Sequence, residues 1–412
     1  MTTIDHKIGS TVLLSKFAEL AMLGQSKTLS TAIVDVIVEG TPLRAHVELD
    51  NTRQHVNADN YRQPVLLLQR QLIREKARRF IAAMPRVHPH FALKCNPLPE
   101  IISIFQEEGV GFEVASKKEL ELLLAQGVNP AAVFYSNPIK SNQHLQFAVD
   151  QGVEWYVVDS VDELRKVHSA KSDAKFYLRI YTSNEGAVWE LSSKFGASHD
   201  DVADIIAVAQ ELAADLGGVT FHSGSQCLNI QNWVTGIRSA RKLFDQLEAL
   251  KFNPRLLNIG GGYPVPLGNV TPEIEAIGAA ISVELDAFGE HVKVIAEPGR
   301  YLVADAGHFV CRVVGTASRG EQRWLYLDAG FYGGLIEMND LPFILHTDRS
   351  GPKRDWHMAG PTCDSIDVFK EVRQLPAGMQ ADDFVYIEAG GAYTNSTACE
   401  FNGFAMPEVQ FI

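Results

Sequence analysis

The 412-residue sequence has little of what marks a secreted, metal-binding or membrane protein. Its 5 cysteines form no Cys-x-x-Cys pair and no His-Glu-x-x-His motif occurs, so we expect free thiols and no metal site. No run of about 18 apolar residues is present, and the first residues lack the basic and apolar regions of a signal peptide. These absences predict a cytoplasmic protein that does not enter a membrane.

Positive charge is also scarce. Lys and Arg number 37 against 50 Asp and Glu, which gives a net charge of -13. Surfaces that bind nucleic acid or anionic lipid need clustered basic residues, so neither partner is expected. A small cationic substrate is compatible with this charge.

What the sequence does contain is an ordinary globular composition, with 46% hydrophobic and 21% charged residues. A chain of this length predicts about two domains, one of which can be an α/β barrel of roughly 250 residues.

Short apolar runs alternate with helical-period segments from Phe91 onward, a pattern typical of a parallel sheet. Eight such runs are present: FALKCNP from Phe91, GFEVAS from Gly111, VFYSNP from Val133, WYVVDS from Trp155, KFYLRIY from Lys175, VTFHSGSQ from Val219, LLNIGGGYP from Leu256 and VKVIAEPGRYL from Val292. Eight strand-helix units predict a closed (β/α)8 barrel, in which catalytic groups and phosphate sites occupy the carboxyl ends of the strands.

A second, all-β domain is predicted around the barrel. After about residue 305 the pattern changes to short strands and turns, and the runs STAIVDVIVEG and LRAHVELD before the barrel also alternate like strands. We therefore predict an N-terminal segment over residues 1–27, a discontinuous β domain over 28–62 and 306–412, and a cofactor-binding barrel over 63–305. The run QRQLIREKARRFIAAM predicts a helix that leads into the barrel.

Two loops predict a divided phosphate site. Gly260, Gly261 and Gly262 follow the seventh run, and Gly299 and Arg300 follow the eighth. Glycines let backbone N–H groups approach an anion, and the loops after strands 7 and 8 are the usual phosphate site of such barrels. A tight turn that requires positive φ is the alternative explanation of the triple glycine.

Lys94 and Glu297 lie on the same predicted rim. A buried lysine has a lowered pKa and can form a Schiff base, although Lys94 can equally reach solvent from a strand end. Glu297 beside a phosphate site indicates a cation between them, for example a protonated pyridine nitrogen, whereas an ion pair with Arg300 is the simpler alternative. Amine, phosphate site and carboxylate together suggest pyridoxal 5'-phosphate.

In these motifs, and in GPTCDSID and GAYTNSTACEFNGF, the chain resembles the ornithine/diaminopimelate/arginine decarboxylases, fold type III of the pyridoxal-phosphate enzymes, from about Pro64 to the C-terminus. The resemblance implies that Lys94 carries the cofactor, Glu297 binds the pyridine nitrogen and His222 stacks on the ring. It assigns the phosphate to Ser225, Gly261, Gly262, Gly299, Arg300 and Tyr393. Glu113 and Arg179 would support the site, although each is also compatible with a structural ion pair, and His222 with a hydrogen-bonded rim histidine.

The resemblance also implies a homodimer with shared active sites. Cys363 of one subunit would protonate the carbanion in the other, and Asp364 would bind the distal amine of the substrate. Lys194 and Asp367 would form an ion pair between subunits. Cys363 is alternatively a small buried apolar residue.

The substrate is expected to be a basic amino acid, L-ornithine or L-lysine, because the segment DAGFYGGLIEMNDLPF resembles bacterial ornithine and lysine decarboxylases. Glu337 or Asp340 would supply a second acid for the distal ammonium, or either is a solvated charge. Diaminopimelate decarboxylases read CES at Cys363–Ser365, which counts against that substrate. The alternatives are a modified diamino acid and a non-catalytic regulatory homologue.

Overall fold

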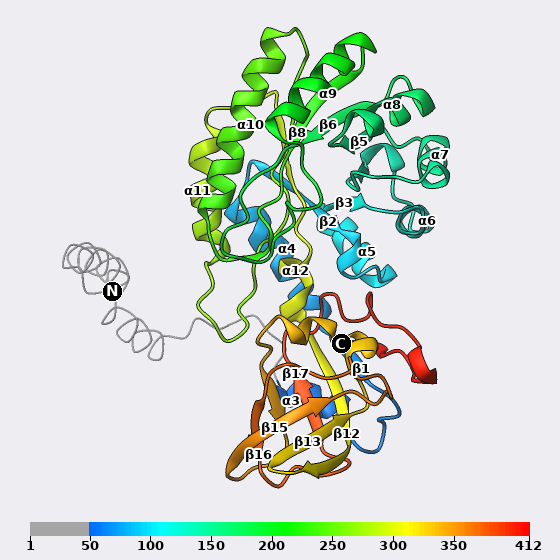
Figure 1. Cartoon of the computed structure of the whole chain (residues 1–412), viewed down its shortest axis with the longest axis vertical. Helices are drawn as coiled ribbons and strands as arrows, with labels where there is room; N and C mark the ends of the chain where they lie inside the picture. The colour runs from blue at the N-terminus through cyan, green and yellow to red at the C-terminus, as the bar shows by residue number, and fades with distance from the viewer. Residues whose placement is uncertain (1–48) are drawn as a thin grey trace, which may run out of the picture. The chain divides into compact units, whose positions relative to one another are not determined.

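The computed structural model describes residues 49–412 of the chain, and its first domain is a closed barrel of eight parallel strands (Figure 1). In chain order the strands are β2 (Val87–Ala92), β3 (Gly111–Val114), β4 (Phe134–Tyr135), β5 (Trp155–Val158), β6 (Lys175–Arg179), β8 (Asp215–Thr220), β10 (Leu256–Asn258) and β11 (Lys293–Ala296). Each lies within or next to one of the eight predicted runs, so the predicted fold class is confirmed. The ring closes because β11 pairs with β2.

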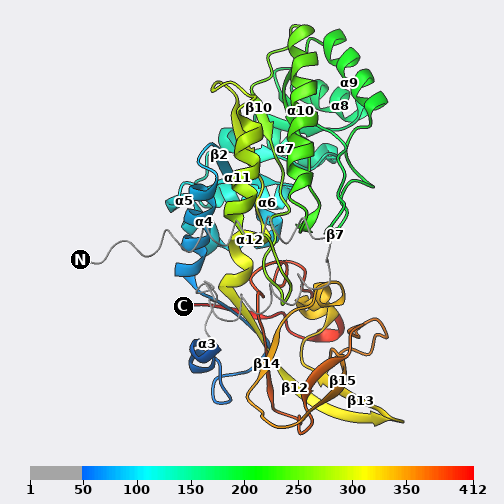
Figure 2. The ribbon, with the colours of Figure 1, turned by 90° about the vertical axis from the view of Figure 1, so that its left-hand side faces the viewer.

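Helices cover the outside of the barrel, and they are α4 (Arg70–Ala83), α5 (Pro99–Glu107), α6 (Lys117–Ala125), α7 (Asn142–Gln151), α8 (Val161–Ala170), α9 (His199–Glu211), α10 (Gln231–Ala249) and α11 (Ile274–Leu285). Four of them begin at a serine, Ser116, Ser141, Ser160 or Ser198, whose side chain accepts a hydrogen bond from the backbone three residues later. Such N-caps satisfy amides that the helix leaves unpaired. Figure 2 shows α10 and α11 side by side outside the strands.

The second domain is built on a sheet of eight strands, as the sequence predicted in outline. Its central path contains β12 (Gly307–Arg319), β13 (Gln322–Leu327), β14 (Leu345–Thr347), β15 (Lys353–Ala359), β16 (Arg373–Pro376) and β17 (Phe384–Ile387). The short helix α12 (Arg300–Val303) leads from β11 toward β12. The chain therefore passes from the rim of the barrel into this sheet through one short helical segment.

Two details differ from the predicted domain bounds. Strand β1 (Val65–Leu68) pairs with β12 and with β18 (Glu408–Phe411), so this buried VLLL run belongs to the β sheet although the predicted barrel began at residue 63. The last two residues of the predicted strand LRAHVELD, Leu49 and Asp50, instead begin the helix α3 (Leu49–His55). The apolar or buried positions in and just after this helix, Leu49, Thr52 and Val56, recur at helical spacing. The remainder of that run, the run STAIVDVIVEG and the predicted segment 1–27 lie outside the described residues.

The five cysteines form no disulfide, and three of them are buried, whereas Cys363 and Cys399 are exposed. Between residues 49 and 412 no cluster of His, Cys, Asp and Glu side chains is arranged to hold a metal. None of the helices in that range is long and apolar enough to span a membrane.

Candidate active site

Lys94 lies in a single helical turn (Leu93–Cys95) directly after β2, at the carboxyl end of the barrel. Its ammonium group is 3.2 Å from a carboxylate oxygen of Glu113, the third residue of β3, which is paired beside Ala92. The Lys94 side chain is 51% exposed and that of Glu113 only 1%. The charge of Glu113 outweighs the effect of burial and raises the pKa of Lys94, so the predicted lowering is wrong for the chain by itself.

Glu297 follows β11 on the same rim. One of its carboxylate oxygens accepts hydrogen bonds from Ser136 Oγ and Asn258 Nδ2, each at 2.6 Å, and Ser136 also contacts the hydroxyl of Tyr177 at 2.8 Å. Burial and the nearby charge of Glu113 raise the pKa of Glu297 to about 7. The alternative ion pair with Arg300 is not formed, because Arg300 binds another carboxylate.

Ser136, Asn258 and Tyr177 are functional neighbours that the sequence analysis did not assign. All three lie in runs that it quoted, VFYSNP, LLNIGGGYP and KFYLRIY. A polar residue at the end of an apolar strand was the available signal, since carboxyl ends of barrel strands meet at one rim.

The two loops of the predicted phosphate site lie side by side, because they follow β10 and β11, which are hydrogen-bonded neighbours. Among the hydrogen bonds of residues 49–412, none is donated by the backbone N–H groups of Gly261, Gly262, Gly299 or Arg300. Unpaired backbone amides on two adjoining loops are groups that could bind an anion.

The glycines are required for two reasons. Gly260 and Gly262 have φ of +67° and +97°, so the tight-turn explanation is correct for these two positions. Gly261 has no such conformation, but a Cβ there would lie 2.5 Å from the carbonyl oxygen of Glu297. The loop is therefore packed against the residue that carries the carboxylate.

Tyr393 and Ser225 approach this site from other segments. Tyr393 adopts a left-handed conformation with φ of 58°, its N–H donates to Cys95 O at 2.9 Å, and a Cβ on Gly299 would lie 3.3 Å from its hydroxyl. Ser225 begins β9 (Ser225–Cys227), which is tied to the glycine loop by Cys227 N donating to Gly262 O at 2.9 Å. Both residues therefore belong to segments that contact the two glycine loops.

His222 lies beside the glycine loop, since a Cβ on Gly261 would be 3.2 Å from its Nε2. The Nδ1 atom accepts a hydrogen bond from Gly224 N at 3.0 Å. Burial, and then the charge of Arg179, lower the pKa of His222 well below its usual value. The imidazole is therefore neutral and presents a flat face beside the site.

Arg179, the last residue of β6, donates to Leu191 O at 3.1 Å and lies over the ring of Phe195. Burial lowers its pKa, and the carboxylates of Glu297, Asp159 and Glu113 oppose that shift. Arg179 is therefore a partly buried charge that offsets the acidic rim, and no structural ion pair is seen for it among the described residues.

Arg300 and Glu337 were predicted to bind phosphate and substrate respectively, but the structure pairs them. Two hydrogen bonds of 2.6 and 2.8 Å join the guanidinium to the carboxylate. Asp340, the other predicted acid, accepts from Trp189 Nε1 at 3.2 Å and lies 3.4 Å from Lys370 Nζ.

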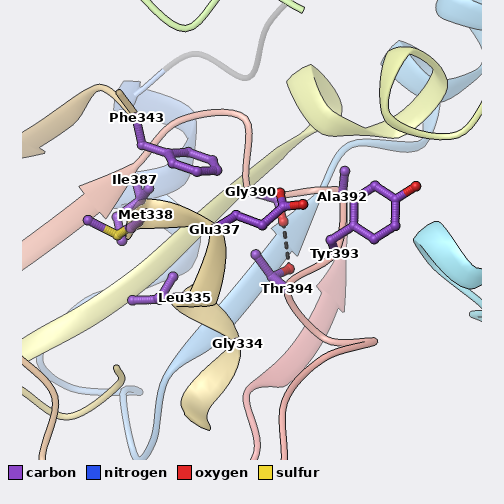
Figure 3. Close-up of a pocket in the computed structure, with 10 residues that line it drawn as sticks. All are labelled: Gly334, Leu335, Glu337, Met338, Phe343, Ile387, Gly390, Ala392, Tyr393 and Thr394. Carbon is purple, nitrogen blue, oxygen red and sulfur yellow. Dashed lines mark hydrogen bonds between the residues drawn. The ribbon is translucent and has the colours of Figure 1, made fainter. Parts of the chain in front are cut away.

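Next to this pair the chain forms a small hollow of about 10 Å³, which is partly open to solvent (Figure 3). Its wall is largely apolar, with Leu335, Met338, Phe343 and Ile387, and Figure 3 shows Glu337 extending between this wall and Tyr393. The hollow thus adjoins the predicted phosphate ligand Tyr393.

Cys363 and Asp364 form a separate cluster on the β domain. Asp364 accepts a hydrogen bond from the Tyr332 hydroxyl at 2.7 Å, which lowers the pKa of Asp364, and the Tyr332 ring stacks on Phe401 at 4.2 Å. Within residues 49–412 no hydrogen bond or ion pair joins this cluster to Lys94, Glu113 or Glu297. One chain does not bring the two halves of the predicted site together.

In the predicted ion pair of Lys194 and Asp367, the carboxylate of Asp367 is already hydrogen-bonded within its own chain. Asp367 is buried, and its carboxylate already accepts hydrogen bonds from the N–H of Phe331 and from Thr362. Lys194 lies over the ring of Phe195. An ion pair between subunits would have to share the Asp367 carboxylate with these bonds.

The rim residues fit pyridoxal phosphate. Lys94 supplies an amine, four unpaired amides supply the phosphate site, and Glu297 supplies a carboxylate for a pyridine nitrogen. Glu113 in addition has a buried carboxylate oxygen without a hydrogen-bond partner in the described part of the chain. A parallel barrel with these groups on one rim defines an enzyme of the class that carries pyridoxal phosphate on lysine.

Comparison with known proteins identifies the family. Residues 70–304 match the model of the pyridoxal-dependent decarboxylase, pyridoxal binding domain. Lysine/ornithine decarboxylase of Selenomonas ruminantium is 34% identical over 344 residues, which cover 83% of this chain and 87% of that protein. The chain belongs to the pyridoxal-dependent decarboxylases of fold type III, and the predicted family, cofactor and enzyme class are confirmed.

Two further relatives are similar to this chain over most of its length. The structure of lysine/ornithine decarboxylase of Vibrio vulnificus complexed with cadaverine has a TM-score of 0.82 and 32% identity, and covers 89% of this chain and 99% of its own. Antizyme inhibitor 2 of Xenopus laevis is 34% identical over 362 residues, covering 82% of this chain and 78% of that protein.

Proposed function

We propose that this decarboxylase acts on a basic amino acid, L-ornithine first and L-lysine second, and releases carbon dioxide and the corresponding diamine. The names of the Selenomonas and Vibrio relatives support these substrates. The observation that carries the proposal is the Asp364 carboxylate, which is held by Tyr332 on the surface beside Cys363. An acid so placed suits the distal ammonium of a diamino acid.

The chain's own residues have distinct tasks in this reaction. Lys94 would hold the cofactor through its side-chain amine, which lies beside the carboxylate of Glu113. When bound, pyridoxal phosphate supplies an electron-accepting ring that takes up the electron pair left by the departing carboxylate. Glu297 holds a proton at the pyridine nitrogen, and the neutral His222 provides a flat face that orients the ring.

We propose that the active form is a homodimer in which Cys363 and Asp364 of the partner complete the site. One chain leaves this pair apart from Lys94, and apolar side chains around it are exposed, including Ile366 at 52% and Phe401 at 41%. Burial of such side chains favours association. Cys363 would then deliver the proton that replaces the lost carboxylate.

A modified diamino acid is the second candidate substrate. Glu337 is bound to Arg300, and Asp340 to Trp189 and Lys370, so neither acid is free for a second contact with a distal ammonium. A substrate whose distal amine carries an acyl group needs no such contact.

A panel assay tests the proposal. Carbon dioxide and amine release are measured with L-ornithine, L-lysine, diaminopimelate and an N-acylated diamino acid. We expect turnover with ornithine or lysine well above that with diaminopimelate. Turnover only with diaminopimelate or only with the acylated compound would exclude the first candidate, and a purified protein that binds the cofactor without turnover would favour the regulatory alternative.

We also propose a cytoplasmic location. Five unpaired cysteines, two of them exposed, are compatible with a reducing compartment. Fluorescence microscopy of the tagged full chain tests this.

A further inference from the structure

We infer that Glu337 is a positioning residue for the cofactor's phosphate site, which it serves by fixing Arg300, and that it does not bind the distal amine of the substrate. The inference deepens the proposed function and relies on its assignment of the cofactor site.

The pair has the geometry of a permanent structural contact. Both oxygens of Glu337 accept from the two terminal nitrogens of Arg300, at 2.6 and 2.8 Å. The Arg300 side chain is 5% exposed and that of Glu337 17%. A planar two-bond pair fixes the orientation of both groups, and neither oxygen of Glu337 remains without a donor.

Two aromatic rings also lie close to the guanidinium of Arg300. The rings of Trp189 and Tyr393 lie 5.2 and 4.9 Å from its central carbon. Trp189 is fixed in turn by its hydrogen bond to Asp340, and Tyr393 by its backbone bond to Cys95. Arg300 is thereby surrounded by one carboxylate and two aromatic rings from three separate segments of the chain.

This arrangement controls the phosphate site because Arg300 and Tyr393 belong to it. The backbone N–H of Arg300 is one of the four unpaired amides, and the Tyr393 hydroxyl lies beside Gly299. A shift of the guanidinium would move the ring that stacks on it and the start of α12. Glu337 thus acts on the phosphate through Arg300.

Charge provides a second reason. Burial disfavours the charged form of Arg300, but the bonds and charge of Glu337 outweigh it, so its pKa is raised. The Nε atom of Arg300 is buried without a partner in the described part of the chain, so loss of Glu337 would leave the guanidinium with no hydrogen-bond acceptor there. Unpaired buried charge is strongly unfavourable, and the side chain would leave its place.

The test is cofactor affinity in the absence of substrate. The full-length Glu337→Gln protein is freed of cofactor and titrated with pyridoxal phosphate, with the visible absorption of the lysine-bound cofactor as readout. We expect the Kd to rise at least tenfold. The matched control is Asp383→Asn, which breaks another two-bond carboxylate–arginine pair of the β domain, with Arg349, away from the site, and should leave the Kd within about twofold.

Two further variants test whether Glu337 acts through Arg300 if the Glu337→Gln protein folds poorly. Glu337→Asp retains the charge at a shorter reach and should weaken cofactor binding less. Arg300→Lys combined with Glu337→Gln should bind no more weakly than Arg300→Lys alone, because the two residues act as a unit. Additive losses would contradict the inference.

Unchanged or tighter cofactor binding in Glu337→Gln would overturn it, since removal of a negative charge near a phosphate would then be the dominant effect. So would a raised KM for ornithine or lysine at unchanged cofactor Kd, which would identify Glu337 as the substrate acid. The titration requires no substrate, so an error in the proposed substrate would leave its outcome intact.

Discussion

The ammonium group of Lys94 lies 3.2 Å from a carboxylate of Glu113 that is almost fully buried. Lys94→Ala removes the cation and leaves this carboxylate without a partner. We expect the cofactor-free protein to lose on the order of 1–3 kcal/mol of unfolding free energy, discounted because Lys94 is half exposed. Because the pKa of Lys94 is raised, the stabilisation by the Lys94–Glu113 ion pair is present at neutral pH and is lost only as pH rises above about 10.5.

Denaturant unfolding near neutral pH measures this loss. The control is Lys94→Ala combined with Glu113→Gln, in which neither charge of the pair remains and much of the stability should return. Equal stability of the single and double variants would show that the unpaired Glu113 carboxylate does not destabilise the protein, contrary to this prediction.

Glu297 predicts a pH dependence of stability in the cofactor-free protein. Its pKa is raised from 4.5 to about 7, so the folded state holds a proton that the unfolded state releases. The stabilisation is complete below pH 4.5 and is lost as pH rises through about 7. Relative to Glu297→Gln, the wild-type protein should therefore lose on the order of 1–3 kcal/mol of unfolding free energy as pH rises over this interval. A difference that stays constant or rises with pH would contradict the account.

We expect Gln226 to be a second positioning residue for the proposed phosphate site, because its side chain binds the backbone of Val265. It has φ of 50°, and its side chain donates to Val265 O at 2.5 Å and accepts from Val265 N at 3.1 Å, which ties β9 to the segment after the triple glycine. Such a conformation persists only where neighbours impose it. We expect Gln226→Gly to weaken pyridoxal phosphate binding about tenfold in a titration, although glycine relieves the strained φ. Wild-type affinity in this variant would show that only the backbone conformation matters.

The proposed sharing of the active site between subunits predicts complementation between inactive subunits. Lys94→Ala and Cys363→Ala homodimers should each have little activity. Random exchange of subunits would create dimers with one intact site, and activity should recover to about a quarter of wild type. Carbon dioxide release after mixing measures this, and mixing Lys94→Ala with Glu297→Gln is the control. If mixing restores nothing, Cys363 acts within its own chain.

The barrel was predictable because its signals are local. Each of the eight runs combines an apolar core with a turn, and polar residues such as Lys94 and Glu297 end these runs on one rim. The helix α3 was not predicted, because a short segment that contains both Val47 and Leu49 fits alternation as well as helical spacing.

The partners of the site residues were less predictable. Sequence places Arg300 beside the glycines but does not show that Glu337, thirty-seven positions later, takes its guanidinium. Likewise Glu297 is bound by Ser136 and Asn258 from two other strands. These pairings depend on how distant segments pack, and a one-dimensional pattern records only separations along the chain.

Chemical identification of the lysine that carries the cofactor tests whether Lys94 is that residue. The holoenzyme is reduced with borohydride and digested, and the modified peptide is located by mass spectrometry. We expect a pyridoxyl group on Lys94 and none in the Lys94→Ala protein. Modification of another lysine, such as the buried Lys140, or no modification at all, would contradict it.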